Sequence, residues 1–507
     1  MSPNNRETNP DGTGPPDSNL FGRGLLYVVI WSLQLVAGII VSPILAYTLP
    51  PAEFGALASA IALHQVISVL ALLGIDKALV LQRSEDGNDR ASRGLITVAM
   101  VIALLGTLIV GVTAPFWRSA IGFGAYPDLI LAVILWTGPG AAVQVMLSLL
   151  LTEDRFRSFA LLSAISAMGG QTVGLILLFT LHNDATTYAW GGVASQFLAM
   201  VVGVVLTRPS IRGLVNWSVA ARAIRLGFPL AMAGLAIFLL SAGDRIIIQV
   251  LQGTEETGRY QVAYVVGSVV ILLLTFTGTA WTPRFAALRD DAARWALAAH
   301  SRDELYRVLM PMILGVTVAA PVALRVVAPP SFRPESLAIV VFLVAVSAFP
   351  VAASGATGQL LITQRRGTVI GLVTAVAAVT NIVLNFMLVP ALGILGAAVA
   401  TVLAYSLLAK LQRRALPAES IRNSPARLVI KVVVVMLVAA ASILLPQSPE
   451  WNLVRVVVAL GCLPWFIGAL KRARGGSGRI RRNGASRVRH RADPGTRHPT
   501  RRKVPAL

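Results

Sequence analysis

Four charged residues stand inside two long stretches of sequence that are otherwise apolar. Asp76 and Lys77 lie in the first stretch, and Asp244 and Arg245 lie in the second. If these stretches cross a membrane, a charge near the centre of the hydrocarbon layer costs about 2.5–3.5 kcal/mol on insertion scales. Such charges therefore indicate function. A basic side chain can bind an anion such as phosphate, and a carboxylate whose pKa is raised by its surroundings can carry a proton.

The composition requires that these residues belong to a membrane protein. The chain has 507 residues, of which 55% are apolar and only 13% are charged, whereas a soluble protein carries about 25% charged residues. This excludes a soluble enzyme, a disordered chain and a secreted disulfide scaffold. Cys462 is the single cysteine, so no intrachain disulfide can form. Because backbone that crosses a bilayer must satisfy its own hydrogen bonds, the expected fold class is all-α.

We expect a polytopic protein with about fourteen transmembrane helices. Apolar runs of about 20 residues are long enough to cross roughly 30 Å of hydrocarbon. The first run follows residues that lack a basic segment, so it is interpreted as an uncleaved helix and not as a signal peptide. The fourteen runs are approximately 24–47, 55–81, 95–115, 129–151, 159–181, 189–207, 227–251, 260–282, 308–328, 337–361, 368–389, 394–409, 428–445 and 452–470.

The distribution of lysine and arginine supports this number of helices. The N-terminal segment, the even-numbered connections and the C-terminal tail together carry 36 of these residues, whereas the odd-numbered connections carry 3. Cytoplasmic loops are the ones enriched in lysine and arginine, and one missed helix would scramble the alternation. We therefore expect a multi-pass protein of the bacterial cell (inner or plasma) membrane with both termini in the cytoplasm.

The sequence also contains an internal repeat. Residues 48–83 and 244–264 are similar when Gly55 is aligned with Gly258, an offset of 203 that also pairs Glu53 with Glu256. A repeat of six helices is even-numbered, so both copies insert with the same orientation, as in parallel-repeat transporters. The expected parts are a disordered cytoplasmic arm (1–23), an N-lobe with helices 1–6 (24–207), a cytoplasmic linker (208–226), a C-lobe with helices 7–12 (227–409), a C-terminal helix pair (428–470) and a disordered basic cytoplasmic tail (471–507).

Short motifs add a family resemblance. Residues 381–401 read NIVLNFMLVPALGILGAAVAT and resemble the Asn-x-x-x-Asn, Pro, Gly-Ile-x-Gly-Ala-Ala signature of bacterial polysaccharide flippases. The stretch TLPPAEFG at 48–55 resembles the first repeat of that family, and Asp244-Arg245 resembles its second. Over roughly residues 20–470 the chain is thus similar to O-antigen and exopolysaccharide lipid-linked oligosaccharide flippases, in the multidrug/oligosaccharidyl-lipid/polysaccharide exporter superfamily.

This resemblance implies a carrier that works by alternating access. It would move an undecaprenyl-pyrophosphate-linked oligosaccharide from the cytoplasmic to the external leaflet. It would need no cofactor and no ATP hydrolysis, and an ion gradient or the substrate gradient would drive it. The expected partners are the lipid-linked glycan, membrane lipids, and polysaccharide polymerase or glycosyltransferases. The basic tail would contact anionic lipid, and no nucleic acid is expected.

This interpretation suggests a specific role for each of the charged residues. Lys77 would attract the pyrophosphate at the cytoplasmic mouth, and Arg245 would bind it nearer the exit; the alternative is that both long side chains only reach for interfacial water. Asp244 and Asp76 would bind a coupling ion; the alternative is a structural hydrogen-bond acceptor. Because adjacent residues on a helix do not face each other, neither Asp–basic pair is expected to form a self-contained salt bridge.

Four uncharged or weakly basic residues are weaker candidates for lining a cavity: Gln34, His64, Asn381 and Asn385. Asn381 and Asn385 share one helix face, where interhelical hydrogen bonds are the alternative. For His64 the alternative is a buried ring with a satisfied hydrogen bond. No catalytic residues and no metal ligands are expected, because the chain has neither a G-x-x-x-x-G-K-[ST] loop nor an H-E-x-x-H or Cys/His cluster. The chain is therefore not expected to be an enzyme.

Other functions remain as alternatives. One is a multidrug or cation exporter, or a peptidoglycan lipid II flippase, of the same superfamily. Multidrug exporters typically have twelve helices, so the additional pair argues against that activity. A more remote alternative is a membrane-embedded polysaccharide polymerase. It would need a large loop with clustered carboxylates and arginines, which the sequence lacks.

Overall fold

The computed structural model describes residues 37–214, 217–288, 290–420 and 422–491. Within these ranges the chain forms helices joined by short connections, and no strand occurs in them. Thirteen helices in this part are long and apolar enough to cross a membrane, and a shorter apolar helix spans Ala37–Thr48. The expected all-α, polytopic fold class is confirmed. The predicted arm 1–23 lies outside the described residues.

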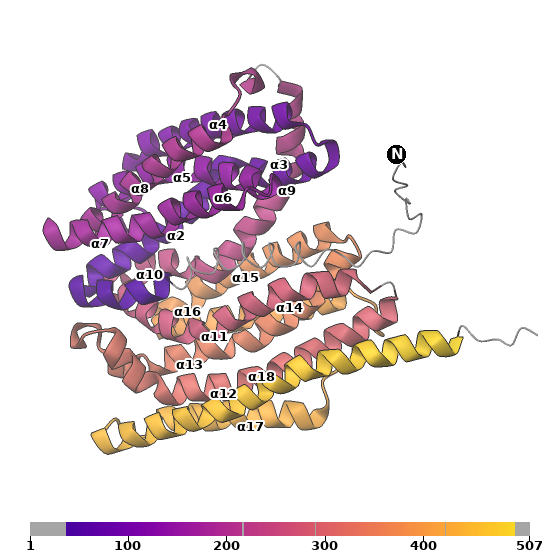
Figure 1. The fold of residues 1–507 in the computed structure, drawn as a ribbon. Coiled ribbons are helices and arrows are strands. Elements are labelled where there is room, and N and C mark those ends of the chain that lie inside the picture. Colours follow the sequence, from indigo (N-terminus) through magenta and orange to yellow (C-terminus); the bar gives the residue numbers. More distant parts are fainter. Residues whose placement is uncertain (1–36, 215–216, 289, 421, 492–507) are drawn as a thin grey trace, which may run out of the picture.

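The helices follow the order expected for two six-helix lobes and an appended pair (Figure 1). The N-lobe continues from Ala37–Thr48 with α2 (Pro51–Leu72), α3 (Ile75–Asp86), α4 (Asp89–Trp117), α5 (Pro127–Thr152), α6 (Phe156–Ser163), the π-helix η1 (Ala164–Gly169), α7 (Gly170–Thr180) and α8 (Ala185–Thr207). The C-lobe contains α9 (Trp217–Ala242), α10 (Asp244–Gln252), α11 (Thr254–Ala286), α12 (Asp291–Val327), α13 (Ala338–Val346), α14 (Ala348–Thr363), α15 (Gly367–Leu392) and α16 (Ile394–Arg414). Short 3-10 turns occur at η2 (Ile211–Leu214), η3 (Pro330–Phe332) and η4 (Pro334–Ser336), and α17 (Ala426–Ile443) and α18 (Pro449–Arg491) complete the chain.

Several runs predicted as single helices are interrupted. The run 55–81 divides into α2 and α3 at Leu73 and Gly74, which adopt φ angles of 48° and 78°. Gly74 also lies so close to Gly227 of α9 that a Cβ atom on Gly74 would lie 2.0 Å from the Gly227 carbonyl oxygen. Only glycine tolerates both the left-handed conformation and this contact. The run 227–251 divides at Gly243, directly before Asp244.

Two expected boundaries differ from the structure. The predicted linker 208–226 is shorter, because α9 begins at Trp217. Disorder is predicted after residue 470, whereas in the structure α18 continues to Arg491. Adding a turn to an existing helix avoids the cost of nucleation, and arginine is a good helix former. Residues 492–507 lie outside the described part.

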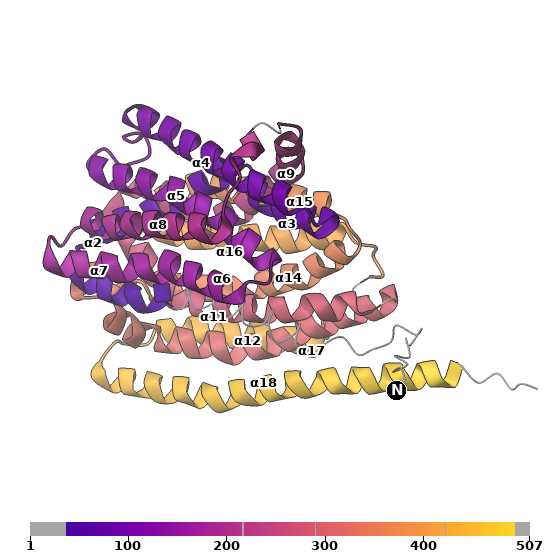
Figure 2. The same ribbon diagram turned by 45° about the horizontal axis from the view of Figure 1, so that its top comes forward.

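The two ends of the bundle differ in charge. The basic end is the end where the arginine-rich connections after α3, α5, α8, α11, α14 and α16 lie, and the opposite end carries the connections after α4, α7, α10, α12, α15 and α17. Hydrogen bonds join connections at each end. At the basic end Arg155 Nη1 donates to the Leu206 carbonyl at 2.8 Å, and at the opposite end the Ala185 amide donates to Glu53 Oε2 at 2.9 Å. The helices α17 and α18 pack on α12, away from the N-lobe (Figures 1 and 2).

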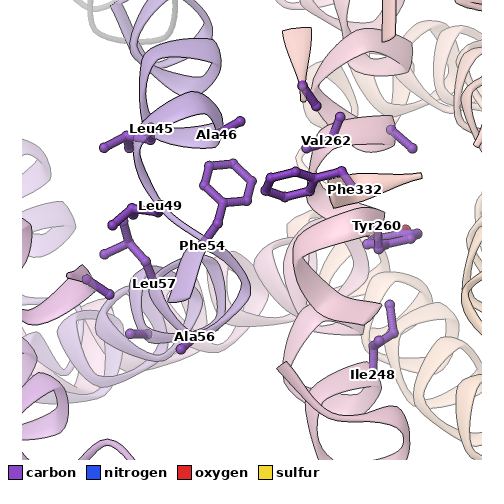
Figure 3. Packing of buried hydrophobic residues seen from close by; sticks show 14 of the residues in the cluster. Leu45, Ala46, Leu49, Phe54, Ala56, Leu57, Ile248, Tyr260, Val262 and Phe332 are labelled. Carbon is purple, nitrogen blue, oxygen red and sulfur yellow. The ribbon is translucent and has the colours of Figure 1, made fainter. Parts of the chain in front are cut away.

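The apolar core joins the lobes at the opposite end. One continuous cluster contains Leu45 and Phe54 from the N-lobe together with Tyr260 and Phe332 from the C-lobe. The Phe54 and Phe332 rings meet edge to face, with centroids 5.6 Å apart (Figure 3). Toward the basic end the buried residues form separate clusters, one in the N-lobe with two alanines of α9 and three in the C-lobe. The lobes are therefore closed against each other at the opposite end.

The two glycines that the repeat aligns make a close backbone contact between the lobes. A Cβ atom on Gly55 would lie 1.8 Å from the Thr254 carbonyl oxygen and 2.5 Å from the Gly258 nitrogen. A Cβ atom on Gly258 would lie 2.1 Å from the Pro51 carbonyl oxygen. The starts of α2 and α11 thus pack backbone against backbone, as small residues permit between helices in membranes.

We expect Gly55→Ala to open the opposite end of the bundle. The added methyl group overlaps Thr254, and overpacking of this kind typically costs about 1–3 kcal/mol. Spin labels on cysteines at the exposed residues Ala125 and Ser331, in a Cys462→Ser background, would report the distance between the lobes. The variant should shift the distance distribution toward longer values than in the parent protein.

Gly461→Ala is the matched control, because a Cβ atom on Gly461 meets no other atom within 4 Å. It should leave the distribution unchanged. A folded Gly55→Ala protein with the parent distribution would contradict the interpretation of this contact.

Candidate functional site

Asp244 and Arg245 form a buried ion pair at the break between α9 and α10. Arg245 Nη1 lies 2.8 Å from Asp244 Oδ1. The same nitrogen donates to the Ser241 carbonyl at 3.1 Å, and Arg245 Nε donates to Gln261 Oε1 at 2.8 Å. Asp244 is 2% exposed and Arg245 is 6% exposed. Asp244 lies in the first turn of α10, where the helix dipole favours a negative charge.

Two tyrosines of α11 complete this group. The Tyr260 hydroxyl donates to Asp244 Oδ2, and the Arg245 guanidinium carbon lies 4.1 Å from the ring centroid of Tyr264, a cation–π contact. We call Asp244, Arg245, Tyr260, Gln261 and Tyr264 the Asp244 cluster. Both oxygens of the carboxylate and most of the guanidinium surface are therefore occupied.

The Asp244 cluster also contacts the N-lobe. The Ser59 hydroxyl on α2 donates to the Arg245 carbonyl at 3.2 Å. The interruption of the helix at Gly243 thus lies where the two lobes meet. A relative movement of the lobes would change the surroundings of the buried charges.

Asp76 and Lys77 form a second, more open pair near the start of α3. Lys77 Nζ lies 3.1 Å from Asp76 Oδ2, and the side chains are 54% and 8% exposed, respectively. Lys77 and Arg245 each pair with the preceding aspartate in the sequence, and not with each other. Lys77 is the accessible one of the two candidate cations.

The prediction that neither Asp–basic pair forms its own salt bridge is wrong. Both aspartates stand in the first turn of a new helix, directly after a break at Gly74 or Gly243. Adjacent positions on a regular helix point about 100° apart, but the long basic side chains fold back across this angle. For the buried Arg245, leaving the charge unpaired would cost more than the side-chain freedom that is lost on pairing.

Asn381 and Asn385 are buried, but their hydrogen bonds remain within α15. Asn385 Nδ2 donates to the Asn381 carbonyl at 2.8 Å and lies 3.2 Å from Asn381 Oδ1. The structure thus has no interhelical hydrogen bond from these two side chains among the described residues, because the spacing of four residues lets the Asn385 amide donate to Asn381 on the same helix. Asn385 Oδ1 and Asn381 Nδ2 have no hydrogen-bond partner among the described residues.

His64 packs inside the N-lobe. Its Nδ1 atom lies 2.9 Å from Thr137 Oγ1, and its ring stacks on Trp136 with centroids 4.7 Å apart. These contacts correspond to the hydrogen-bonded histidine that the sequence left as one alternative, although the side chain is only half-buried. The remaining candidate, Gln34, lies outside the described residues.

Sequence reasoning missed Gln261 and Tyr264 as members of the Asp244 cluster. Tyr260 and Tyr264 are four residues apart and begin the helix that follows the charged pair. This spacing places both rings on one helix face, and was the available signal. Gln261 has no comparable signal, because a single amide in an apolar helix is usually a structural hydrogen-bond group.

Comparisons with known proteins identify what the chain is similar to. Residues 44–333 match the profile of the family described as polysaccharide biosynthesis protein. The chain is 25% identical over 293 residues to the succinoglycan biosynthesis transport protein ExoT of Rhizobium meliloti, covering 56% of this chain and 57% of that protein. It is 24% identical over 414 residues to "Probable flippase AglR" of Haloferax volcanii, covering 76% of this chain and 80% of that protein. The match to the first relative thus spans little more than half of its length.

Solved structures show the fold. The chain superposes on a lipid II flippase MurJ in an inward closed conformation with a TM-score of 0.64, at 12% identity, covering 88% of this chain and 99% of that one. It superposes on an inward-facing multidrug resistance MATE family transporter of the MOP superfamily with a TM-score of 0.53, at 13% identity. This match covers 81% of this chain and 95% of that one. At this identity the likeness establishes a shared architecture of helices.

We expect Asp244→Asn to destabilise the protein strongly. The substitution leaves Arg245 buried without a counter-charge, and breaking a buried pair typically costs about 3–5 kcal/mol. The melting temperature of the purified protein in detergent should fall by several degrees. The double variant Asp244→Asn/Arg245→Met removes both charges and should recover most of the loss.

Asp76→Asn is the matched control, since its partner Lys77 is half exposed and finds water. Its melting temperature should stay close to that of the parent. Equal effects of the two aspartate substitutions would show that burial does not distinguish the pairs.

Proposed function

We propose that this chain, which belongs to the polysaccharide biosynthesis protein family, moves an undecaprenyl-pyrophosphate-linked oligosaccharide across the membrane by alternating access. The observation that carries the proposal is the division of the apolar core. The lobes share one large core at the opposite end, whereas toward the basic end the N-lobe core takes in the start of α9 and the rest of the C-lobe has clusters of its own. A carrier that closes one end at a time needs this arrangement.

The contacts between the lobes are suited to a rocking movement. At the opposite end the contact between Gly55 and Gly258 brings two smooth backbone surfaces together. Farther toward the basic end, Gly74 meets Gly227 in the same way. Backbone contacts between glycines have no interdigitating side chains, so the helices can separate or pivot without first withdrawing a side chain from a packed pocket.

The family supports the class of substrate. Its members are described as polysaccharide biosynthesis proteins, and the relatives are named as a succinoglycan transport protein and a flippase. The fold is shared with lipid II and multidrug transporters and does not separate these alternatives. The glycan carried by a polyprenyl lipid is therefore the proposed cargo, and the polymerase or glycosyltransferases that make and use it are the proposed partners.

Lys77 and Arg245 are the proposed contacts for the pyrophosphate. Lys77 is half exposed in the half of α2–α3 that leads to the basic end, so it can attract an anion that enters there. Arg245 is enclosed in the closed state, and its backbone carbonyl holds Ser59 of the other lobe. Separation of the lobes at the opposite end would break this contact and make the guanidinium accessible to the substrate on its way out.

Asp244 and Asp76 are the proposed sites of ion coupling. In the closed state Asp244 accepts bonds from Arg245 and Tyr260 and needs no further cation. When the substrate draws Arg245 away, the buried carboxylate requires a proton or a metal cation in its place. An ion gradient could then return the carrier to its starting state, with no catalytic step and no cofactor.

The proposed location is the bacterial cell membrane, with the basic end and both termini in the cytoplasm. The alternation of 36 basic residues on one side with 3 on the other supports this orientation. The multi-pass character itself follows from the thirteen apolar helices.

We expect cells without this chain to accumulate a lipid-linked oligosaccharide in the cytoplasmic leaflet. In such cells Arg245→Lys, which retains the charge but not the bidentate fork, should restore export poorly at a normal protein level. Arg427→Gln, an exposed arginine at the start of α17, is the control and should restore export fully. Normal surface glycan in the deletion strain, without accumulation, would remove the proposed substrate.

We also expect the two ends to differ in chemical accessibility. In a Cys462→Ser background, Arg333→Cys at the opposite end should react with a membrane-impermeant thiol reagent in whole cells. Arg366→Cys at the basic end should react only after the membrane is opened. The reverse pattern would invert the proposed orientation.

A further inference from the structure

The N-lobe contains a basic cavity that the transport proposal does not use. It has a volume of about 700 Å³ and is lined by Arg93, Arg155, Val205, Leu206 and Arg208. It lies at the basic end, where the start of α4, the connection between α5 and α6, and the end of α8 converge. Three of its five lining residues are arginines.

The arginines are organised around one carboxylate. Glu153, whose side chain is 8% exposed, lies 3.2 Å from Arg93 Nη2, 3.3 Å from Arg155 Nη1 and 3.6 Å from Arg83 Nη2. Arg83 and Arg93 also pair with Asp89. Arg93 and Arg155 donate in addition to backbone carbonyls at the end of α8. The positions of these guanidinium groups are therefore fixed by several bonds each.

Arg208 supplies an additional positive charge. It follows the last residue of α8 with φ 47°, in the left-handed region, and is exposed. It has no ion-pair partner among the residues that the structure describes. Three arginines thus share the two carboxylates Asp89 and Glu153, and Arg208 adds to the wall of the cavity a positive charge that is unpaired within the described part of the chain.

An apolar stripe on α8 leads to this cavity. Phe197, Val201 and Val205 follow each other at four-residue spacing, so these three lie on one helix face, and Arg208 comes directly after the end of the helix. The apolar members of the stripe are 41%, 58% and 69% exposed. On a membrane-spanning helix these side chains face the acyl chains of the bilayer. The cavity therefore opens where α8 leaves the hydrocarbon layer.

We propose that this cavity binds the phosphate headgroup of an anionic phospholipid, whose acyl chains lie along the stripe on α8. Basic pockets between transmembrane helices bind such headgroups, and arginine matches the paired oxygens of a phosphate. The pyrophosphate of a polyprenyl-linked glycan has related chemistry. The ordinary phospholipid fits better, because the lining residues come from the N-lobe and the connection that follows it, with none from the C-lobe, and because the exposed Val205 of the stripe is one of them.

A bound phosphate would also fix local structure. Arg93 and Arg155 hold the last carbonyls of α8, and the Ser210 amide donates to the Arg93 carbonyl at 3.0 Å. The segment 208–214 therefore rests on α4 before the chain enters the C-lobe. A lipid held by Arg208 would bind this segment more firmly to the N-lobe.

The test measures lipid binding by the full-length protein, by native mass spectrometry from nanodiscs. Phosphatidylglycerol should bind, and phosphatidylcholine, which has no net charge, should not. Arg208→Gln should weaken phosphatidylglycerol binding about fivefold, because it removes one arginine from the phosphate site, and a fivefold change corresponds to about 1 kcal/mol. Arg208→Lys should recover most of the affinity. Because Arg208 has no ion pair, its loss should leave the fold intact.

Arg427→Gln is the matched control, because it removes the same charge from an exposed position at the basic end of the C-lobe. It should leave the affinity unchanged.

Equal weakening by both substitutions would overturn the proposal, since it would indicate general attraction to an anionic surface. So would displacement of the lipid by millimolar inorganic phosphate, which indicates a site for a soluble anion. Displacement by undecaprenyl pyrophosphate, at a concentration that leaves bulk phosphatidylglycerol in excess, would instead assign the cavity to the cargo. None of these measurements depends on glycan export.

Discussion

The backbone contact between α2 and α11 determines how the rest of the molecule is arranged. Gly55 and Gly258 let the two helices approach until a single methyl group would not fit between them. This approach brings Phe54 against Phe332 and merges the apolar residues of both lobes into one core at the opposite end. Because lipid is as apolar as these side chains, close packing and not the hydrophobic effect must hold the lobes together.

The same constraint explains why the buried charges occur at interruptions of helices. A break such as Gly74 or Gly243 exposes backbone polar groups, which hydrocarbon cannot satisfy. Each break therefore lies against protein: Gly74 against α9, and the residue pair after Gly243 against α2. Asp244 and Arg245 gain partners there that a continuous, lipid-facing helix would not offer. The charges and the breaks are consequences of one requirement.

Most of the architecture could be predicted from hydropathy and charge, because a span is a property of about 20 consecutive residues. The breaks could not, since they depend on which helix a glycine meets: Gly74 contacts Gly227, more than 150 residues away in sequence. The prediction that Asp244 and Arg245 would not pair was wrong for the same reason, because it assumed a regular helix through Gly243. The motif-based family resemblance is confirmed by the match over residues 44–333. The roles of Lys77, Arg245, Asp76, Asp244 and the two asparagines in transport stay predictions.

The position of the Asp244 cluster links charge to conformation. Arg245 interacts through its side chain with Gln261 and Tyr264 of its own lobe, and through its carbonyl with Ser59 of the other lobe. If α2 and α11 separate, the Ser59 contact is lost, whereas the side-chain contacts within the C-lobe are kept. The cation then borders the opening passage while its counter-charge remains fixed on α10. In the proposed cycle, an anion that enters the passage would compete with Asp244 for the guanidinium, and its binding would stabilise the separated lobes by the difference in its affinity for the two states. Anion binding and closure at the opposite end would then oppose each other, which is the coupling that the proposed outward transport requires.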